Sequence, residues 1–176
     1  MNSVDITYQP GQTPLDPDEK AGLIPKHISM QGELNAWEQF NILKGLRWSK
    51  RQLKRDILDD VFLRELHQRM FGETWAWAGT YRMSDKNIGC DWRQVSMRVR
   101  NLLDNTKYQI EHRVTDPDEL AIRFHHQLVL IHPFPNGNGR HSRLITDLLL
   151  RTMGLEHFSW GSGGYASLVN KTVIRA

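Results

Sequence analysis

A glycine-rich segment between two apolar runs restricts the fold of this chain more than any other feature. The segment HPFPNGNGRHSR, residues 132–143, directly follows the run LVLI and directly precedes the run LITDLLL. Glycine adopts positive φ angles without steric cost, whereas proline prevents a helix from continuing. We therefore predict two buried helices joined by a tight loop, the second helix beginning at about Asn138 or Gly139.

The alternation of asparagine and glycine from Asn136 to Gly139 is typical of a backbone that binds anions. Gly137 and Gly139 allow successive N–H groups to turn toward one point. A helix that starts there adds an N-terminal partial charge of roughly +0.5. The sequence therefore predicts that the backbone of residues 136–140 binds phosphate.

Charged and titratable side chains flank this loop. Arg140 and Arg143 are three residues apart, so they lie on one side of the helix, and each can form forked hydrogen bonds to phosphate oxygens. His132 ends the preceding helix, because Pro133 follows it, and its imidazole can take a proton from a hydroxyl. Each residue alone is commonly a cap or a surface residue, but together they favour a site for a di- or triphosphate with a base beside it.

Helical spacing of apolar residues predicts most of the remaining fold. Leu58, Phe62, Leu66 and Met70 recur every four residues, and Gly72 supplies a stop signal. Further helices are predicted from Glu33 onward, after Asp91 through Ile110, from Asp116-Pro117 through Ile131, from Leu144 to about Gly154, and within the last residues of the chain.

Two segments depart from this helical pattern. Residues 1–28 hold four of the seven prolines, which predicts an extended N-terminal arm ahead of one domain over residues 29–176. Between Thr80 and Asp91, glycines flank a polar tip, which predicts a short β-hairpin. The fold class is therefore mainly α with one hairpin.

Composition narrows the range of functions. The 176 residues suit one domain, the formal net charge is only +3, and a single cysteine excludes an intrachain disulfide. The N-terminus lacks a signal-peptide pattern and no apolar run approaches the roughly 20 residues that cross a bilayer, so we expect a cytoplasmic protein without a membrane partner. The basic run from Lys44 to Arg55 is interpreted as a solvated helix face rather than a nucleic-acid site.

HPFPNGNGRHSR resembles the signature loop of the Fic family, whose pattern is His-Pro-Phe, any residue, an acid, Gly-Asn-Gly-Arg, two residues, Arg. LRELHQRMFGETWAWAGTYR is similar to the segment that precedes the family's flap, and the resemblance covers residues 33–170. ELNAWEQFNI and the arm resemble a subgroup called mobile mystery protein B. The resemblance implies a Fic-like helical domain with a short β-hairpin flap.

The same resemblance implies transfer of AMP, or another nucleoside monophosphate, from a nucleoside triphosphate such as ATP to a hydroxyl of a target protein, with Mg²⁺. His132 would be the base, and Asn138 with the glycine-flanked backbone would hold the α-phosphate. Arg140 would bind the distal phosphates, and Arg143 the terminal phosphate or an inhibitory glutamate. Phe134 would anchor the loop in the core.

The sequence departs from the Fic pattern at Asn136 and at Leu34. Asn136 replaces the acid that helps to position Mg²⁺, and a neutral amide is a poorer ligand for that ion. Ser29 and Glu33 match two positions of the family's inhibitory helix, so Glu33 would reach Arg143, although Leu34 replaces a small residue. The Ser29–Glu33 spacing also fits a capping box at a helix start.

The resemblance places the target protein on the flap, residues 80–91, as an added strand. The main alternative is a nucleotide-responsive binding module of a toxin–antitoxin pair, with an antitoxin as partner and Asn136 marking weakened catalysis. Less favoured alternatives are nucleic-acid binding by the run 44–55 and a metal hydrolase built from His125, His126, His132 and His141.

Overall fold

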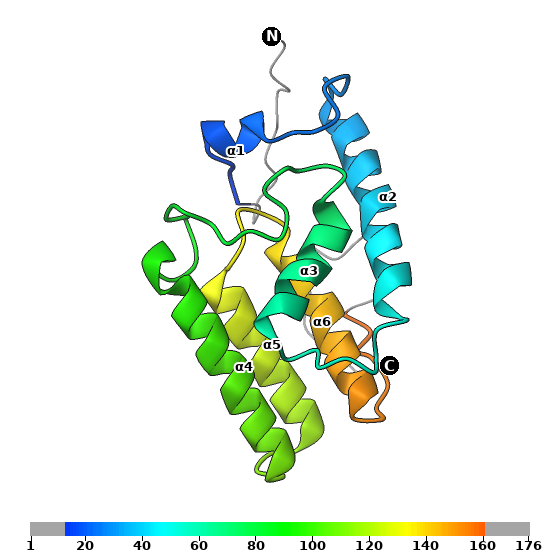
Figure 1. Cartoon of the computed structure of the whole chain (residues 1–176), viewed down its shortest axis with the longest axis vertical. Coiled ribbons are helices and arrows are strands. Elements are labelled where there is room, and N and C mark those ends of the chain that lie inside the picture. Colours follow the sequence, from blue (N-terminus) through cyan, green and yellow to red (C-terminus); the bar gives the residue numbers. More distant parts are fainter. Residues whose placement is uncertain (1–12, 161–176) are drawn as a thin grey trace.

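The computed structural model describes residues 13–160, and this part of the chain is mainly helical, as predicted (Figure 1). It contains no β-ladder, only an isolated bridge between Leu23 and Trp75. The helices are α1 (Pro17–Ala21), α2 (Gln31–Ser49), α3 (Asp60–Phe71), α4 (Val95–Glu111), α5 (Pro117–Ile131) and α6 (Asn138–Thr152), with a 3₁₀ turn η1 (Trp92–Gln94) before α4.

Capping residues explain where the helices begin. The Asp59 carboxylate accepts hydrogen bonds from the N–H groups of Val61 and Phe62 at the start of α3. Asp116 caps α5 in the same way, and Pro117 takes the first helical position, as its sequence predicts. Gly72 follows the end of α3, which confirms the predicted stop.

Helix α3 is central and packs against α2, α4 and α6, while α5 packs between α4 and α6 (Figure 1). The α3 side chains of Phe62, Leu63 and Leu66 have no exposed surface. They meet Ile145 and Leu149 of α6 in one continuous core. Because each such side chain contributes about 1.5–3 kcal/mol on burial, this core holds α6 against α3.

Helices α2 and α3 approach closely at one glycine. A Cβ on Gly45 would lie 2.8 Å from the Met70 Cγ atom and 2.9 Å from its Cα atom. Nearby, the buried Asn41 side chain accepts from the Glu73 N–H and donates to the Arg69 carbonyl. Helix α2 thereby satisfies polar backbone groups at the end of α3.

The described part of the N-terminal arm, residues 13–28, docks onto the domain, with Leu15, Leu23 and Ile28 buried. The prediction of an extended arm is wrong for α1. Pro17 occupies its first position, and the Glu19 carboxylate accepts from the N–H of the preceding cap residue, so a short helix forms. Residues 1–12 and the predicted C-terminal helix pattern lie outside the described residues.

The hairpin predicted between Thr80 and Asp91 is not found: in the described chain this segment is a loop without strand pairing. The buried Arg82 guanidinium donates to the carbonyl oxygens of Ser84, Cys90 and His132. The Arg82 side chain therefore donates to carbonyl groups that would otherwise accept hydrogen bonds in a β-ladder. It also links the segment to the α5–α6 loop.

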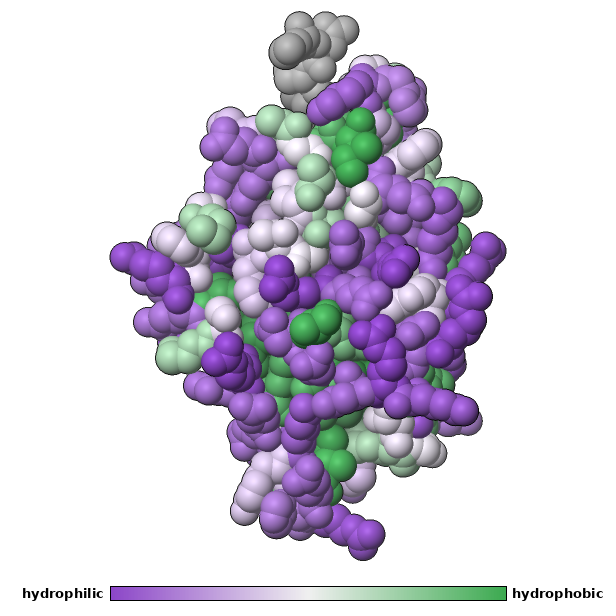
Figure 2. Space-filling model, viewed as in Figure 1, coloured by the Kyte–Doolittle hydropathy of each residue, from purple (hydrophilic) through white to green (hydrophobic). Residues whose placement is uncertain are grey.

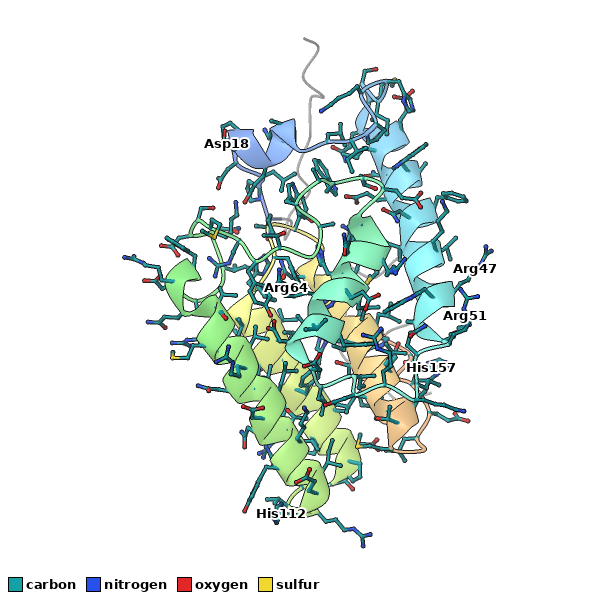
Figure 3. All side chains as sticks on the ribbon, viewed as in Figure 1. Asp18, Arg47, Arg51, Arg64, His112 and His157 are labelled. Carbon is teal, nitrogen blue, oxygen red and sulfur yellow. The ribbon has the colours of Figure 1, made fainter. Side chains whose placement is uncertain are left out.

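The outer surface is mostly polar. Figure 2 shows hydrophilic residues over the visible face, with small hydrophobic patches between them. No helix in residues 13–160 combines the length and apolar character needed to span a bilayer. Arg47 of α2 and Arg51, just after the helix, belong to the basic run; both are exposed and point outward in Figure 3, which agrees with a solvated face.

Candidate active site

The α5–α6 loop begins and ends with left-handed residues. His132, which follows α5, has φ 54° and ψ 63°, and Gly137, which precedes α6, has φ 78°. The conformation of a non-glycine residue such as His132 costs roughly 1–2 kcal/mol, so surrounding contacts must hold it. Helix α6 begins at Asn138, as predicted.

The Asn138 side chain braces this loop. Its Oδ1 accepts from the Phe134 N–H at 2.9 Å, and its Nδ2 donates to the Phe134 carbonyl at 2.8 Å. Phe134 is fully buried, which confirms its predicted anchoring role. Since the Asn138 amide is engaged on both sides, a phosphate contact at this residue falls to its backbone N–H.

Unpaired donors stand at the start of α6. Within residues 13–160, the N–H groups of Asn138, Gly139 and Arg140 have no hydrogen-bond acceptor. The Gly137 N–H is used, because it donates to Asn136 Oδ1 at 2.6 Å. The donors of the first helical turn point out of the helix end, where the helix dipole attracts an anion.

The two predicted arginines have different surroundings. Arg140 Nη1 donates to Glu38 Oε2 of α2 at 2.8 Å, and its guanidinium lies over the Phe71 ring. Arg143 is half-buried, and a Cβ on Gly139 would lie 3.7 Å from its Nη2 atom, so its guanidinium is beside the first turn of α6.

The imidazole of His132 is buried and faces a hydroxyl. The residue is 5% exposed, and its Nε2 lies 3.1 Å from Thr13 Oγ1. Burial, together with the charges of Arg82 and Lys86, lowers the pKa of His132 to about 4. At neutral pH the ring is therefore uncharged, which is the form that accepts a proton.

Residues 80–91 border His132 although they form no hairpin. The Arg82 N–H donates to the Pro133 carbonyl at 2.9 Å, and the Arg82 Nε donates to the His132 carbonyl at 2.6 Å. A Cβ on Gly89, whose φ is +111°, would lie 2.9 Å from the His132 Cβ. This segment thus forms one wall beside the imidazole.

His67 is a further residue of the site, which the sequence patterns did not indicate. Its Nε2 is 3.0 Å from the Asn136 carbonyl, to which it donates, and its Nδ1 accepts from the Gly79 N–H. Its ring stacks on Phe134 with centroids 3.8 Å apart. Burial and the nearby His141 hold the pKa of His67 well below its usual value. A histidine beside Leu66 on an apolar helix face was the available signal.

Arg64 supports the same region. Its Nε donates to the Gly79 carbonyl at 2.9 Å, and its guanidinium lies over the Tyr81 ring. Figure 3 shows Arg64 near the middle of the molecule, between α3 and the loops above it. Helix α3 therefore holds Gly79, directly before the wall, through Arg64 and His67.

Residues 57–150, more than half of the chain, match the sequence model of the Fic/DOC family. The chain belongs to the Fic/DOC family. The matched region contains the whole α5–α6 loop and α3, which carries His67. Membership in the mobile mystery protein B subgroup stays a prediction.

Two curated relatives are similar over part of their length. The protein adenylyltransferase fic-1 of Caenorhabditis elegans is 30% identical over 102 residues, which are 55% of this chain and 20% of that protein. The protein of the same name from Caenorhabditis briggsae is 49% identical over 39 residues, which are 22% of this chain and 8% of that protein. The chain therefore spans a fifth or less of these relatives.

Solved structures of Fic domains share the fold. The N-terminal Fic domain of Bep8 from Bartonella sp. 1-1C has a TM-score of 0.65 at 18% identity, covering 77% of this chain and 72% of that one. BepC from Bartonella tribocorum, with bound AMPPNP, has a TM-score of 0.62 at 19% identity, covering 79% and 80%. At this identity the likeness establishes a mainly helical Fic-like fold and nothing finer.

Asn136, which departs from the pattern of the Fic family, is directed away from metal binding. Its Oδ1 accepts from the Gly137 N–H, and its Nδ2 donates to the Thr13 carbonyl at 3.1 Å. Among residues 13–160, no group of three histidine, cysteine, aspartate or glutamate side chains is placed to hold a metal ion. The signature loop, residues 132–143, contains no carboxylate to hold Mg²⁺, and the zinc hydrolase alternative lacks a ligand cluster in the described chain.

The structure does not bring Glu33 to Arg143. The Glu33 carboxylate accepts from the N–H groups of Ser29 and Met30 at the start of α2, which is the capping role that the spacing also indicated. The glutamate that reaches the signature loop is Glu38, which lies further along the same helix and also accepts from the Trp75 indole.

Proposed function

We propose that this Fic protein transfers a nucleoside monophosphate, AMP from ATP in the first instance, to a hydroxyl side chain of a protein. One observation carries the proposal: a buried, uncharged imidazole faces a hydroxyl 3.1 Å from its Nε2. The unpaired N–H groups at the start of α6 lie a few residues further along the same loop. The name protein adenylyltransferase, borne by the curated relatives, supports this reaction class.

The reaction divides among these groups as follows. His132 takes the proton from the acceptor hydroxyl, the oxygen attacks the α-phosphorus, and pyrophosphate leaves. The N–H groups of Asn138, Gly139 and Arg140 bind phosphate oxygens. A pKa of about 4 makes the imidazole a weak base. The negative charge of a bound nucleotide raises that pKa toward the working range.

The arginines bind the outer phosphates in this proposal. Arg143 is beside the first turn of α6, and Arg140 joins it after leaving Glu38. Mg²⁺ enters with the nucleotide phosphates rather than on a carboxylate of this loop, because Asn136 is neutral and already paired.

Autoinhibition, which the resemblance assigned to Glu33, fits Glu38 better. Glu38 Oε2 and Arg140 Nη1 are 2.8 Å apart, and the Glu38 side chain is 12% exposed. While that ion pair persists, the Arg140 guanidinium is not directed at a phosphate. We expect Glu38→Gln to raise transfer, and Glu33→Gln to leave it unchanged while weakening the start of α2.

The target protein is proposed to dock on residues 80–91, since this segment adjoins His132. The alternative, a nucleotide-responsive module of a toxin–antitoxin pair, is favoured by Asn136, whose amide oxygen is satisfied by the Gly137 N–H. Both readings predict nucleotide binding, and only the first predicts transfer.

The test is transfer of label from α-³²P-ATP to proteins of a cell lysate in the presence of Mg²⁺. His132→Ala should reduce labelling by about 100-fold or more. His126→Ala, an exposed histidine of α5, is the matched control and should label normally. Absence of label, with ATP still bound, would favour the binding module. Absence of ATP binding would reject both readings.

A further inference from the structure

The N-terminal arm enters the candidate active site at Thr13. Thr13 is 7% exposed, and its Oγ1 is 3.1 Å from His132 Nε2. Its carbonyl accepts from Asn136 Nδ2 at 3.1 Å. The side chain and the backbone of one residue are thus each held by a residue of the signature loop.

A second anchor holds the arm just beyond this point. The Lys86 Nζ is 2.9 Å from Asp16 Oδ2 and 2.6 Å from Glu19 Oε2. Ser84 Oγ also donates to Asp16 Oδ2. The Lys86 side chain is only 2% exposed, so its charge requires these carboxylates in place of water.

The residues between the two anchors fit the same arrangement. Leu15 is buried in the main core, which places an apolar contact between the hydroxyl and the acidic anchor. Pro14 has no N–H to satisfy and restricts the chain between Thr13 and Leu15. The arm therefore lies across the wall formed by residues 80–91, with its hydroxyl at the imidazole, as an acceptor protein would.

We propose that Thr13 is an acceptor hydroxyl of this protein, which transfers a nucleoside monophosphate to its own arm. The inference rests on the proposed function. The proton of Thr13 Oγ1 passes to His132 Nε2, and Oγ1 forms a bond to the α-phosphorus of a nucleoside triphosphate. The bond from that phosphorus to the bridging oxygen breaks, pyrophosphate leaves with this oxygen, and the imidazolium returns its proton to solvent. Thr13 then carries a phosphodiester.

This assignment has a consequence for other acceptors. While the arm is docked, Thr13 occupies the place beside His132 Nε2, so an outside hydroxyl must first displace the arm. Because the arm and the site belong to one chain, the modification is intramolecular. Its rate constant should not depend on protein concentration.

The experiment incubates the full chain with ATP and Mg²⁺ and measures intact mass, followed by fragmentation to locate the adduct. We expect one AMP on Thr13. Thr13→Val should carry none, Thr13→Ser should retain it, and Thr152→Val, an exposed threonine at the far end of α6, should behave as the parent. Each variant is also prepared with Glu38→Gln, so that the Arg140 ion pair does not hide activity.

Two further measurements sharpen the result. Lys86→Met should slow modification of Thr13 by about tenfold or more, because the arm loses its charged anchor. Tenfold dilution of the protein should leave the fraction modified per minute unchanged. Thermal unfolding followed by circular dichroism shows whether Thr13→Val folds, and Thr13→Ser tests the assignment if it does not.

Failure of the Thr13 assignment and failure of the proposed transfer give different results. Label on lysate proteins with an unmodified Thr13 overturns this inference and leaves the proposed function standing. An adduct on a different residue, unchanged in Thr13→Val, overturns it in the same way. No adduct on any protein, including the Glu38→Gln variants, overturns the inference and the proposed transfer together.

Discussion

The α5–α6 loop and the segment 80–91 lie against each other, yet different kinds of contact hold them. The loop closes on itself, because Asn138 bonds to the backbone of Phe134, four residues earlier. The segment 80–91 is held by distant partners: Arg82 reaches His132, and Lys86 reaches Asp16 and Glu19. The closure of the loop at Asn138 is therefore encoded locally, whereas the segment also depends on distant parts of the fold for its shape.

Removing the Arg82 guanidinium should have the largest effect. Arg82→Met leaves the carbonyl groups of Ser84, Cys90 and His132 without this donor in a buried region. We expect a loss of about 3–5 kcal/mol in the free energy of unfolding, measured by urea titration. Arg93→Met, at an exposed position, should change it by less than about 0.5 kcal/mol. Equal losses would show that the two regions are not tied by Arg82.

Gly137→Ala tests the local closure of the loop. The φ of 78° is unfavourable for alanine, and the new Cβ would lie 2.7 Å from the Phe71 ring. Strain and overpacking together predict a loss of about 2–4 kcal/mol. Gly32→Ala is the control, because nothing lies within 4 Å of its added Cβ in helix α2. It should stabilise the protein by about 0.4–1 kcal/mol, and both are read by thermal unfolding.

Features that depend on residues close in the sequence could be predicted from it, whereas features that depend on distant residues could not. The helix start at Asn138, the cap at Asp116 and the stop at Gly72 depend on near neighbours, and the structure confirms the elements they bound. The predicted hairpin fails because Arg82 bonds to carbonyl groups up to 50 residues away in the chain.

Long-range pairing also explains what was missed in the site. Glu38 meets Arg140 across 102 positions, and Thr13 meets His132 across 119. The spacing Ser29–Glu33 drew attention to the wrong glutamate because it is a local signal, and it describes a helix cap correctly. His67 shares a helix face with core residues, so its spacing alone does not distinguish a residue of the site from a residue that only packs in the core.

A lower pH should destabilise the α5–α6 loop more than the segment 80–91. Burial lowers the pKa of His132 and of His141 to about 4, from an ordinary value of 6.5, whereas residues 80–91 contain no histidine. Between these pH values the unfolded chain binds more protons than the folded chain, so stability is full above pH 6.5 and falls as pH drops toward 4.

The expected loss between pH 7 and pH 5 is about 2 kcal/mol for each such histidine. His132→Gln should therefore lose about 2 kcal/mol less than the parent over this range, measured by urea titration at each pH. His126→Gln, at an exposed position of α5, should lose as much as the parent. A pH profile unaffected by His132→Gln would mean that this imidazole titrates normally in the folded protein.

The smallest effect is expected where a single long-range bond is removed near solvent. Ser84→Ala deletes the hydrogen bond from Ser84 Oγ to Asp16 Oδ2, whose side chain is 48% exposed, so we expect about 0.5 kcal/mol or less. Its effect should be local: faster proteolysis within residues 80–91, with the rate of cleavage in the α5–α6 loop unchanged. Ser96→Ala, an exposed serine on α4, is the control. If cleavage accelerates equally in both regions, the arm stabilises them as one unit, and the contrast between local and distant anchoring does not hold.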